Sequence, residues 1–454
     1  MILLNKYARP LRIAAITLVL LLLLFAGWRH WRVWSIPDVG DPYDIDAFLA
    51  GYEHDRTSMD VFRETLPEVK RIKQQLAGVG EHTLFNVRWD EALPEVRDLV
   101  GTHRDLIDKW VAALELPPGV EGDPQSANYD ENLPVSFSSQ IVVGLMVLDA
   151  NRLIEEGDLP GARKIYSQIV EVCQHLEHGP ATSQSLADSA YVMMSMSLAW
   201  YMGQAEVDVD ELYDIRTFLA EYDQQKVPLS TTLKFAYLRD RDRLEKELAI
   251  SSMSRWLFNE SEMARRIQQM IYANLLSEAD RPESEQSPVW AHECVSLDQP
   301  EFVLWLRRQL GQTLPNDNNR YCRFTLFRDG PYREDVDEGI HQLIVSHHWL
   351  TLPGSPWRLR FTERNSYYEG VRRVNELQIG LHLYHREYGK FPDSLKDLPK
   401  EYAQLVTAGE GNASGMSFTN TEYGYQLGDG FFVWRVYEPG EDPVPPTSEA
   451  VTEK

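Results

Sequence analysis

The chain has 454 residues but only three cysteines, Cys173, Cys294 and Cys322. So few cysteines exclude a small disulfide scaffold and a zinc site made of four thiolates. Basic residues are also scarce, with 45 lysines and arginines against 69 aspartates and glutamates, which gives a net charge of −24. Because nucleic-acid phosphates repel such a chain, we expect no nucleic-acid partner. A hydrophobic content of 43% predicts a folded, globular body.

Recognisable catalytic motifs are absent as well. The sequence has no zinc-protease, Walker A or dinucleotide-binding signature. In Gly411–Gly415 the serine stands one position too late for a nucleophile elbow. We therefore predict no cofactor and a non-catalytic role in protein binding or scaffolding. The alternative is a membrane-tethered hydrolase with an unrecognised active site built from dispersed carboxylates and histidines.

One long apolar run stands near the N-terminus. Ile13–Trp28 is uncharged, and with Leu11 it extends the apolar segment over residues 11–28. A helix of that length reaches about 27 Å, close to the hydrocarbon thickness of a bilayer. The residues that flank it in the manner of a membrane anchor are Lys6, Arg9, Arg12, Arg29, His30, Arg32, Trp28, Trp31 and Trp34.

This pattern predicts a single transmembrane helix that contacts the lipid bilayer through residues 11–28, with the first residues in the cytoplasm. A cleaved signal peptide is the alternative, but no small-x-small site follows the run. Residues 1–33 contain five basic and no acidic residues, leaving 40 basic against 69 acidic residues in the remainder. Anionic lipid would repel that body, so we expect it to hang from the membrane on a short tether, Ser35–Pro42.

Hydrophobic spacing predicts a mainly α-helical protein, with a helical bundle or α-hairpin body and a small C-terminal α+β module. The predicted regions are 1–34 as cytoplasmic stub and transmembrane anchor, 35–116 as a helical region, 117–134 as a loop or linker, 135–365 as the main helical domain, 366–437 as the α+β module and 438–454 as a disordered acidic tail.

The composition of the helical segments indicates their length and whether they are buried or exposed. The uncharged run Ala190–Met202 is too short to span a bilayer, so we expect a buried helix whose methionines fill the core. No proline occurs between Pro228 and Pro282, which favours long helices with a break near Ser251 or Asn259. The charged stretch Arg239–Glu247 is typical of a solvated helix face.

Residues 156–176 resemble half of a tetratricopeptide repeat. Gly157 stands at the position of the inter-helix turn, Ala162 at the small position and Tyr166 at the aromatic one. No second copy follows at the repeat spacing, so we favour an ordinary antiparallel helix pair with a glycine turn.

The sequence predicts a helix over Ser366–Tyr388 that stops at Gly389, then a turn at Phe391-Pro392, a short helical turn from Ser394 and Leu395, and a hairpin over Tyr423–Tyr437. Most of these elements lie in the C-terminal stretch Asn375–Asp442. It resembles the C-terminal part of type II secretion pseudopilins. The matching residues are Leu383, Tyr384, Tyr388, Gly389, Phe391, Pro392, Leu395, Leu398, Tyr402, Tyr425, Gly430, Phe431, Val433, Tyr437, Gly440 and Asp442.

The resemblance implies a shared small module and a bacterial envelope setting, with the anchor in the inner membrane and the body on the periplasmic or extracytoplasmic side. The N-terminus lacks the pilin processing signature, and the carboxylates near the end, such as Asp429 and Glu438, lack the spacing of the pseudopilin calcium loop. A secretion role is therefore not implied. A protein partner is expected, and the sequence predicts no particular oligomeric state.

Histidine pairs are the candidate metal ligands. His382 and His385 share one helix face and could bind zinc or copper, and His175 and His178 have the same spacing. The alternative is that these histidines lie on solvated helix faces.

Three further features have open interpretations. Cys173 is expected to be a buried thiol, whereas Cys294 and Cys322 could pair if the body faces an oxidising compartment. The arginine-rich segment from Arg358 to Arg373 could dock an acidic partner or the acidic surface of the protein itself, or it could form a solvated helix face.

Overall fold

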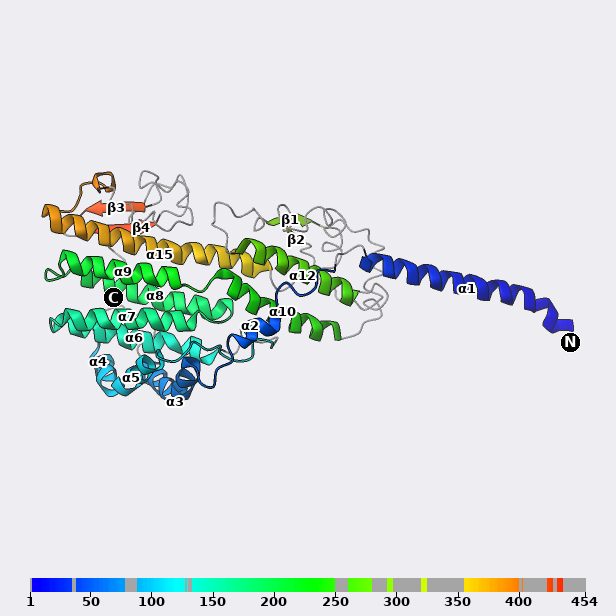
Figure 1. Cartoon of the computed structure of the whole chain (residues 1–454), viewed down its shortest axis with the longest axis horizontal. Helices are drawn as coiled ribbons and strands as arrows, with labels where there is room; N and C mark the ends of the chain where they lie inside the picture. Colours follow the sequence, from blue (N-terminus) through cyan, green and yellow to red (C-terminus); the bar gives the residue numbers. More distant parts are fainter. Residues whose placement is uncertain are drawn as a thin grey trace.

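The computed structural model describes residues 2–34, 38–77, 88–126, 129, 133–249, 260–279, 292–296, 320–324, 355–399, 402, 423–427 and 431–435. These residues form a mainly α-helical protein, as the sequence predicts. A long helix projects from one end of an elongated helical body (Figure 1). The predicted acidic tail, Gly411–Gly415 and the histidines between 341 and 348 lie outside the described residues.

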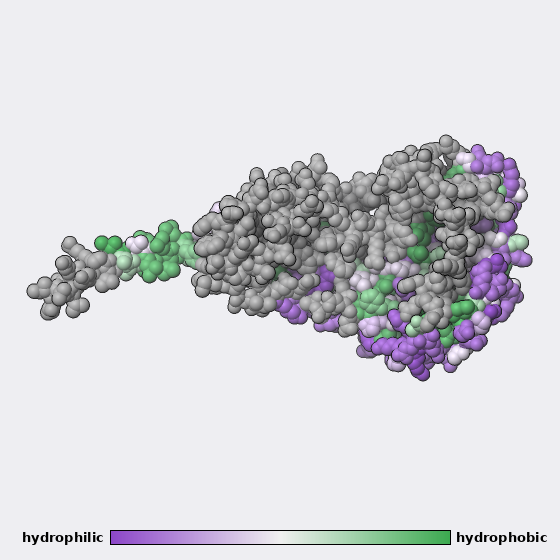
Figure 2. Space-filling model, turned by 180° about the vertical axis from the view of Figure 1, so that it is seen from behind, coloured by the Kyte–Doolittle hydropathy of each residue, from purple (hydrophilic) through white to green (hydrophobic). Residues whose placement is uncertain are grey.

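The projecting helix is α1, Ile2–Trp34. Its apolar side chains point away from the rest of the protein, with Ile13 65% and Leu24 70% exposed. Figure 2 shows this stretch as a continuous hydrophobic surface outside the body. The apolar segment within α1 runs from Arg12 to Trp28. An exposed apolar surface of this kind is unusual in soluble proteins and marks a contact with a membrane or with another protein.

In the described part of the chain, the helix that meets both the length and the hydropathy of a membrane span is α6, Pro134–Glu155. However, 72% of its apolar window is buried inside the protein. It is apolar on nearly all sides because other helices surround it. We therefore assign α6 to the core.

Around α6, consecutive helices form the central bundle. These are α7, Leu159–Leu176, α8, Ala181–Met202, and α9, Val209–Gln225. Short connections make neighbouring helices antiparallel, and α6, α7 and α8 all contact one another (Figure 1). In α8, Met194 and Met202 are fully buried whereas Met196 is 55% exposed. The expected buried helix is confirmed, with one methionine left at the surface.

The α6–α7 turn confirms the predicted helix pair. Gly157 has φ +78°, in the left-handed region that favours glycine. After it, Asp158 caps α7 by accepting a hydrogen bond from the Gly161 amide at 3.1 Å. Ala162 and Tyr166 are fully buried, and the Tyr166 hydroxyl lies 2.7 Å from Ser197 Oγ on α8.

The N-terminal helices of the body share this core. They are α3, Ser58–Leu76, α4, Pro94–Thr102, and α5, Arg104–Ala113, and each contacts α6. Phe62 of α3 stacks on Trp110 of α5 at 4.1 Å between ring centroids. Buried side chains form one continuous cluster from Met59 to Tyr402. The predicted regions 35–116 and 135–365 therefore do not have separate cores.

Between them, the segment predicted as a loop or linker is irregular where described, but it is packed. Glu121 is 2% exposed and accepts hydrogen bonds from the amides of Val135 and Ser136, at the start of α6. Tyr129 and Leu133 are also buried. The loop thus caps a core helix and does not connect two independent domains.

The C-terminal helix α15, Ser355–Tyr388, is longer than the predicted helix and packs on α8 and α9. Leu377 and Leu381 are fully buried in the main cluster. Arg386 donates to the carbonyls of Gln204 and Val207, in the α8–α9 connection. The predicted boundary at residue 366 therefore falls inside a helix of the main core, and an independent C-terminal α+β module is not supported.

After α15 the chain folds back as predicted. Gly389 has φ +73° and ends the helix, and a 3₁₀ turn, η4, follows at Leu395–Asp397. The returning chain lies against α15 at Gly380, where an added Cβ would stand 2.9 Å from the Tyr402 carbonyl oxygen. A larger residue at Gly380 would push this return away from the helix.

Two strand pairs are described. β1, His292–Ser296, and β2, Arg320–Phe324, are antiparallel, and Cys294 stands directly opposite Cys322. β3, Tyr423–Leu427, and β4, Phe431–Arg435, are antiparallel at the predicted hairpin position, and β4 contacts α15. The first pair was not predicted, because neither strand shows a clear alternation of apolar and polar residues.

Candidate functional site

The junction between α1 and the body is built from α2, Ile45–Ala50, α10, Leu229–Ala249, and α12, Glu260–Ala279. The two long helices pack against each other. The predicted break near Ser251 or Asn259 lies outside the described residues. α12 also contacts α1. Every segment that joins the projecting helix to the core therefore meets at this end of the body (Figure 1).

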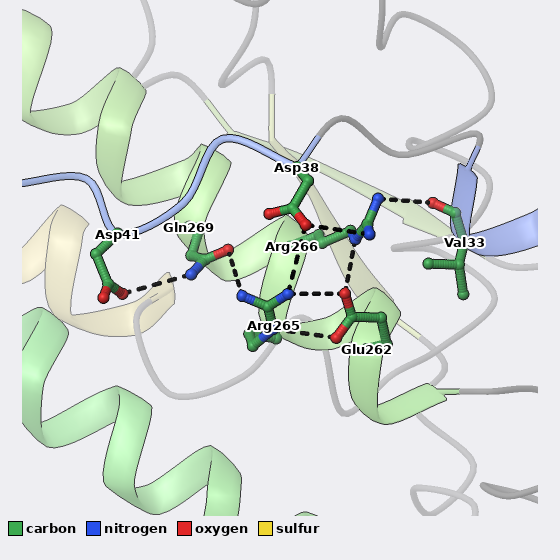
Figure 3. A network of polar contacts seen from close by, with 7 residues as sticks. All are labelled: Val33, Asp38, Asp41, Glu262, Arg265, Arg266 and Gln269. Carbon is green, nitrogen blue, oxygen red and sulfur yellow. Dashed lines mark hydrogen bonds and ion pairs between the residues drawn. The ribbon is translucent and has the colours of Figure 1, made fainter.

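Asp38 is the first acidic residue after α1, and it lies against two arginines of α12. Its Oδ2 is 3.1 Å from Arg266 Nη2 and 3.7 Å from Arg265 Nη2. Arg266 Nη1 also donates to the carbonyl oxygen of Val33 at 3.5 Å. Because the last carbonyls of a helix lack partners within the helix, this contact caps the end of α1 (Figure 3).

Glu262 orients the two arginines from one turn earlier in α12. Its Oε1 is 2.7 Å from Arg265 Nη2 and 2.8 Å from Arg266 Nε. The hydrogen bond from Arg265 is the main cause that lowers the pKa of Glu262, and it likewise raises the pKa of Arg265. Arg266 is the more enclosed of the two, with 15% of its side chain exposed against 43% for Arg265.

Asp41 makes the second attachment. Its Oδ1 accepts hydrogen bonds from the Tyr237 hydroxyl of α10 at 2.5 Å and from Gln269 Nε2 of α12 at 3.4 Å. Arg241 Nη1 lies 3.9 Å from Asp41 Oδ2. Burial and the neighbouring Asp41 raise the pKa of Tyr237, so this hydroxyl remains a donor at neutral pH. Asp41 thus joins the chain to both helices.

Aromatic packing continues this attachment along the chain. The Tyr43 hydroxyl donates to the Lys234 carbonyl at 2.7 Å, and its ring meets Tyr237 edge to face. Phe48 of α2 contacts Phe235 of α10 at 4.9 Å between ring centroids. The described residues of the predicted tether, 38–42, are held against α10 and α12 from Asp38 onward.

We call the group formed by Val33, Asp38, Asp41, Arg241, Glu262, Arg265, Arg266 and Gln269 the polar junction. Its three carboxylates face three guanidinium groups, so its charges balance locally. These groups bind one another and connect the end of α1 to α10 and α12. Sequence reasoning missed these residues. The signal that was available is the Glu262, Arg265, Arg266 spacing, which places three charges on adjacent turns of a helix.

The charged stretch of α10 was predicted as a solvated face, and this is wrong for its first residues. Arg239 is 7% and Asp240 2% exposed. Asp240 accepts hydrogen bonds from Arg239 Nε at 2.8 Å and from the Tyr272 hydroxyl of α12 at 2.5 Å. The i,i+4 pair between Asp242 and Lys246 is present at 2.7 Å. Helix α12 covers one side of this stretch, which periodicity alone could not show.

The candidate metal ligands His382 and His385 both lie against Phe391, in the turn after α15. His385 stacks on the Phe391 ring at 4.3 Å, and His382 meets it edge to face at 5.8 Å. His382 is 8% exposed, and burial lowers its pKa to about 4, so the solvated-face alternative is wrong for this residue. Within the described residues, no group of three or more His, Cys, Asp or Glu side chains is placed to hold a metal ion.

The other histidine pair connects α7 to the N-terminal helices. His175 Nδ1 lies 2.8 Å from Ser58 Oγ, and His178 Nδ1 lies 3.4 Å from the Tyr52 hydroxyl. Burial lowers the pKa of both, that of His175 to about 4 with a contribution from His178. These imidazoles are therefore neutral at pH 7 and act as structural contacts.

Two other candidates are placed within the core or against it. Cys173 is a fully buried free thiol, as predicted, and burial raises its pKa. Of the arginine-rich segment, Arg372 forms an ion pair with Asp223 of α9. Arg372 thus contacts an acidic residue of the protein itself, in line with one of the three alternatives.

Comparisons with models of protein families, with curated proteins and with solved structures find no match to this chain.

Proposed function

We propose that this protein is a single-span membrane protein of the bacterial inner membrane. Its α1 crosses the bilayer with the N-terminus in the cytoplasm, and its helical body binds a protein partner on the periplasmic side. The role is scaffolding without catalysis. The observation that carries the proposal is the polar junction, which fixes an apolar, outward-facing helix to one end of a folded body.

Three features support an anchor in α1. Its apolar side chains are exposed along the whole Arg12–Trp28 segment, which in water would be an aggregation site. Trp28 and Trp31 follow at the end nearer the body and remain exposed, at the depth where tryptophans occur at membrane interfaces. The junction then begins within a few residues, which suits a body held directly below the headgroups.

The topology is tested by cysteine labelling in cells with a permeabilised outer membrane. In a chain with Cys294→Ser and Cys322→Ser, we introduce Ala450→Cys in the tail or Asn5→Cys at the N-terminus. A membrane-impermeant maleimide should label position 450 in intact spheroplasts and position 5 only after lysis. Labelling of position 450 only after lysis would contradict the proposed orientation.

The binding role is tested by crosslinking in living cells, capture in mild detergent and mass spectrometry. We propose that residues after Tyr402, with the pseudopilin-like hairpin, contact the partner. Deletion of this part leaves the buried leucines of α15 in place, whereas deletion from Asn375 would remove them. The proposal is supported by an envelope protein that is recovered in stoichiometric amounts and is lost when 403–454 is deleted. When that protein is itself used for capture, it should recover this chain. Recovery of the protein alone would contradict it.

A further inference from the structure

Cys294 and Cys322 are 28 positions apart in the sequence, and that separation alone leaves open whether they meet. The strand register answers this. Cys294 of β1 is the partner of Cys322 of β2, between the pairs Glu293–Arg323 and Val295–Tyr321. Two of the three cysteines of the chain therefore stand directly opposite each other in an antiparallel ladder.

Directly opposite positions satisfy the main geometric requirement of a disulfide. In antiparallel pairs the Cα atoms of opposite residues are about 4.5 or 5.5 Å apart, depending on the hydrogen-bonding class. Disulfides join residues whose Cα atoms are about 4.4–6.8 Å apart, so both classes fall inside this range. Diagonal positions, two residues along the partner strand, are about 7–8 Å apart and lie beyond it.

We infer that Cys294 and Cys322 form a disulfide bond that fastens β1 to β2. Cys173 takes no part, because it is a fully buried free thiol in the helical core. The bond closes the chain between 294 and 322 into a loop, and it secures a two-stranded pair that would be marginal without further support.

The bond forms by thiol–disulfide exchange with an oxidising protein disulfide, or with oxidised glutathione in the test tube. One cysteine thiolate attacks the oxidant disulfide, forms a mixed disulfide and expels one oxidant thiolate. The second cysteine thiolate then attacks the sulfur of the first and expels the other. Two electrons pass from the cysteines to the oxidant, and the two protons lost by the cysteine thiols balance the two oxidant thiols that form.

In one respect this inference rests on the proposed function, because a lasting disulfide requires that the body face an oxidising compartment. Two experiments separate these claims. In the first, the purified full-length protein in mild detergent is reduced, equilibrated with glutathione redox buffers, quenched with acid, alkylated and digested with trypsin. We expect the peptide 321–323 joined to the peptide that contains Cys294. Glutathione adducts on both cysteines without a joined peptide would overturn the inference.

A matched control moves one cysteine along the same strand. The double variant Cys322→Ser, Arg320→Cys keeps three cysteines but places the new one diagonal to Cys294. We expect at least a tenfold lower yield of the joined peptide from this variant. Equal yields would show that the register does not determine the pairing and would overturn the argument.

The second experiment alkylates the protein in acid-quenched cells before lysis. A joined peptide supports both the disulfide and the proposed side of the membrane. Free thiols in cells, together with a joined peptide in the glutathione experiment, would contradict the proposed location and the presence of the bond in cells, while leaving the register argument intact.

Discussion

At the scale of single residues, Arg266 carries the attachment of α1. It binds the Asp38 carboxylate, the Glu262 carboxylate and the Val33 carbonyl, and only 15% of its side chain is exposed. Arg265 stands next to it with a similar set of acidic neighbours but is 43% exposed. Substitution of Arg265 therefore serves as the control for substitution of Arg266.

We predict that Arg266→Ala lowers the free energy of unfolding by about 1–3 kcal/mol, because it removes the largely enclosed guanidinium that binds Asp38, Glu262 and the Val33 carbonyl. Arg265→Ala should cost less than about 1 kcal/mol, as exposed ion pairs do. Urea unfolding in detergent measures both, and hydrogen exchange should show faster exchange in 38–52 for Arg266→Ala. Equal effects of the two substitutions would show that the enclosed arginine has no special role.

His175 predicts a pH dependence. Its pKa is lowered from 6.5 to about 4, so the folded state favours the neutral imidazole. The contribution of His175 to the free energy of unfolding is fully present above pH 6.5. It is lost as the pH drops towards 4, because the unfolded chain binds the proton more readily.

The measurement is the urea midpoint at pH 7.5 and pH 5. We expect His175→Gln to reduce the loss of stability between these values. His54→Gln serves as the control, because His54 is exposed, and it should leave the loss unchanged. If His175→Gln changes nothing, this histidine is not protonated on unfolding in that range.

At the scale of elements, the α6–α7 turn depends on the conformation of one glycine. Gly157 has φ +78°, and an added Cβ there would meet no atom within 4 Å. The effect of a substitution is therefore backbone strain alone. We predict that Gly157→Ala costs about 1–2 kcal/mol of unfolding free energy.

Gly101 is the matched control. It also has no atom within 4 Å of an added Cβ, but it lies inside helix α4 without a positive φ. Gly101→Ala should raise the stability by up to about 1 kcal/mol. Thermal unfolding followed by circular dichroism measures both, and a stabilising Gly157→Ala would exclude the left-handed turn.

The same turn shows what a sequence can predict. The helix pair could be predicted from Gly157, Ala162 and Tyr166, because a glycine turn and close-packing positions are local features of a sequence. The Gly389 helix end was predictable for the same reason. The burial of Arg239 and Asp240 was not, because it depends on α12, which lies 20 or more positions further along the chain.

The candidate site was also out of reach of the sequence. The short segment after α1 contains prolines and a glycine, from which the sequence predicts only a short tether. What holds it are partners more than 190 positions away, such as Tyr237 and Gln269. Long-range pairs of this kind leave no periodic signal in a single sequence.

At the scale of the whole molecule, one continuous core includes residues from Met59 to Tyr402. A chain that ends after Tyr402 should therefore unfold cooperatively, with a melting temperature close to that of the full-length protein. A chain that ends after Val374 loses four buried aliphatic residues of α15, Leu377, Ile379, Leu381 and Leu383. Since each such loss costs about 2–5 kcal/mol, we expect it not to fold.

Circular dichroism melting and proteolysis of the two truncated proteins measure this difference. A folded chain ending after Val374 would show that the C-terminal helix is a separate unit after all, as the sequence had indicated.

If α1 crosses a bilayer as proposed, the polar junction passes the tilt of α1 on to the body. α15 alone has 34 residues and extends for about 51 Å along the body, away from α1 (Figure 1). Transmembrane helices tilt by about 20° on average, and with a stiff connection such a tilt would carry the far end of the body sideways by about 17 Å. A thinner or thicker bilayer would therefore change the sideways position of the far end of the body, because the arginines of α12 connect the body to α1.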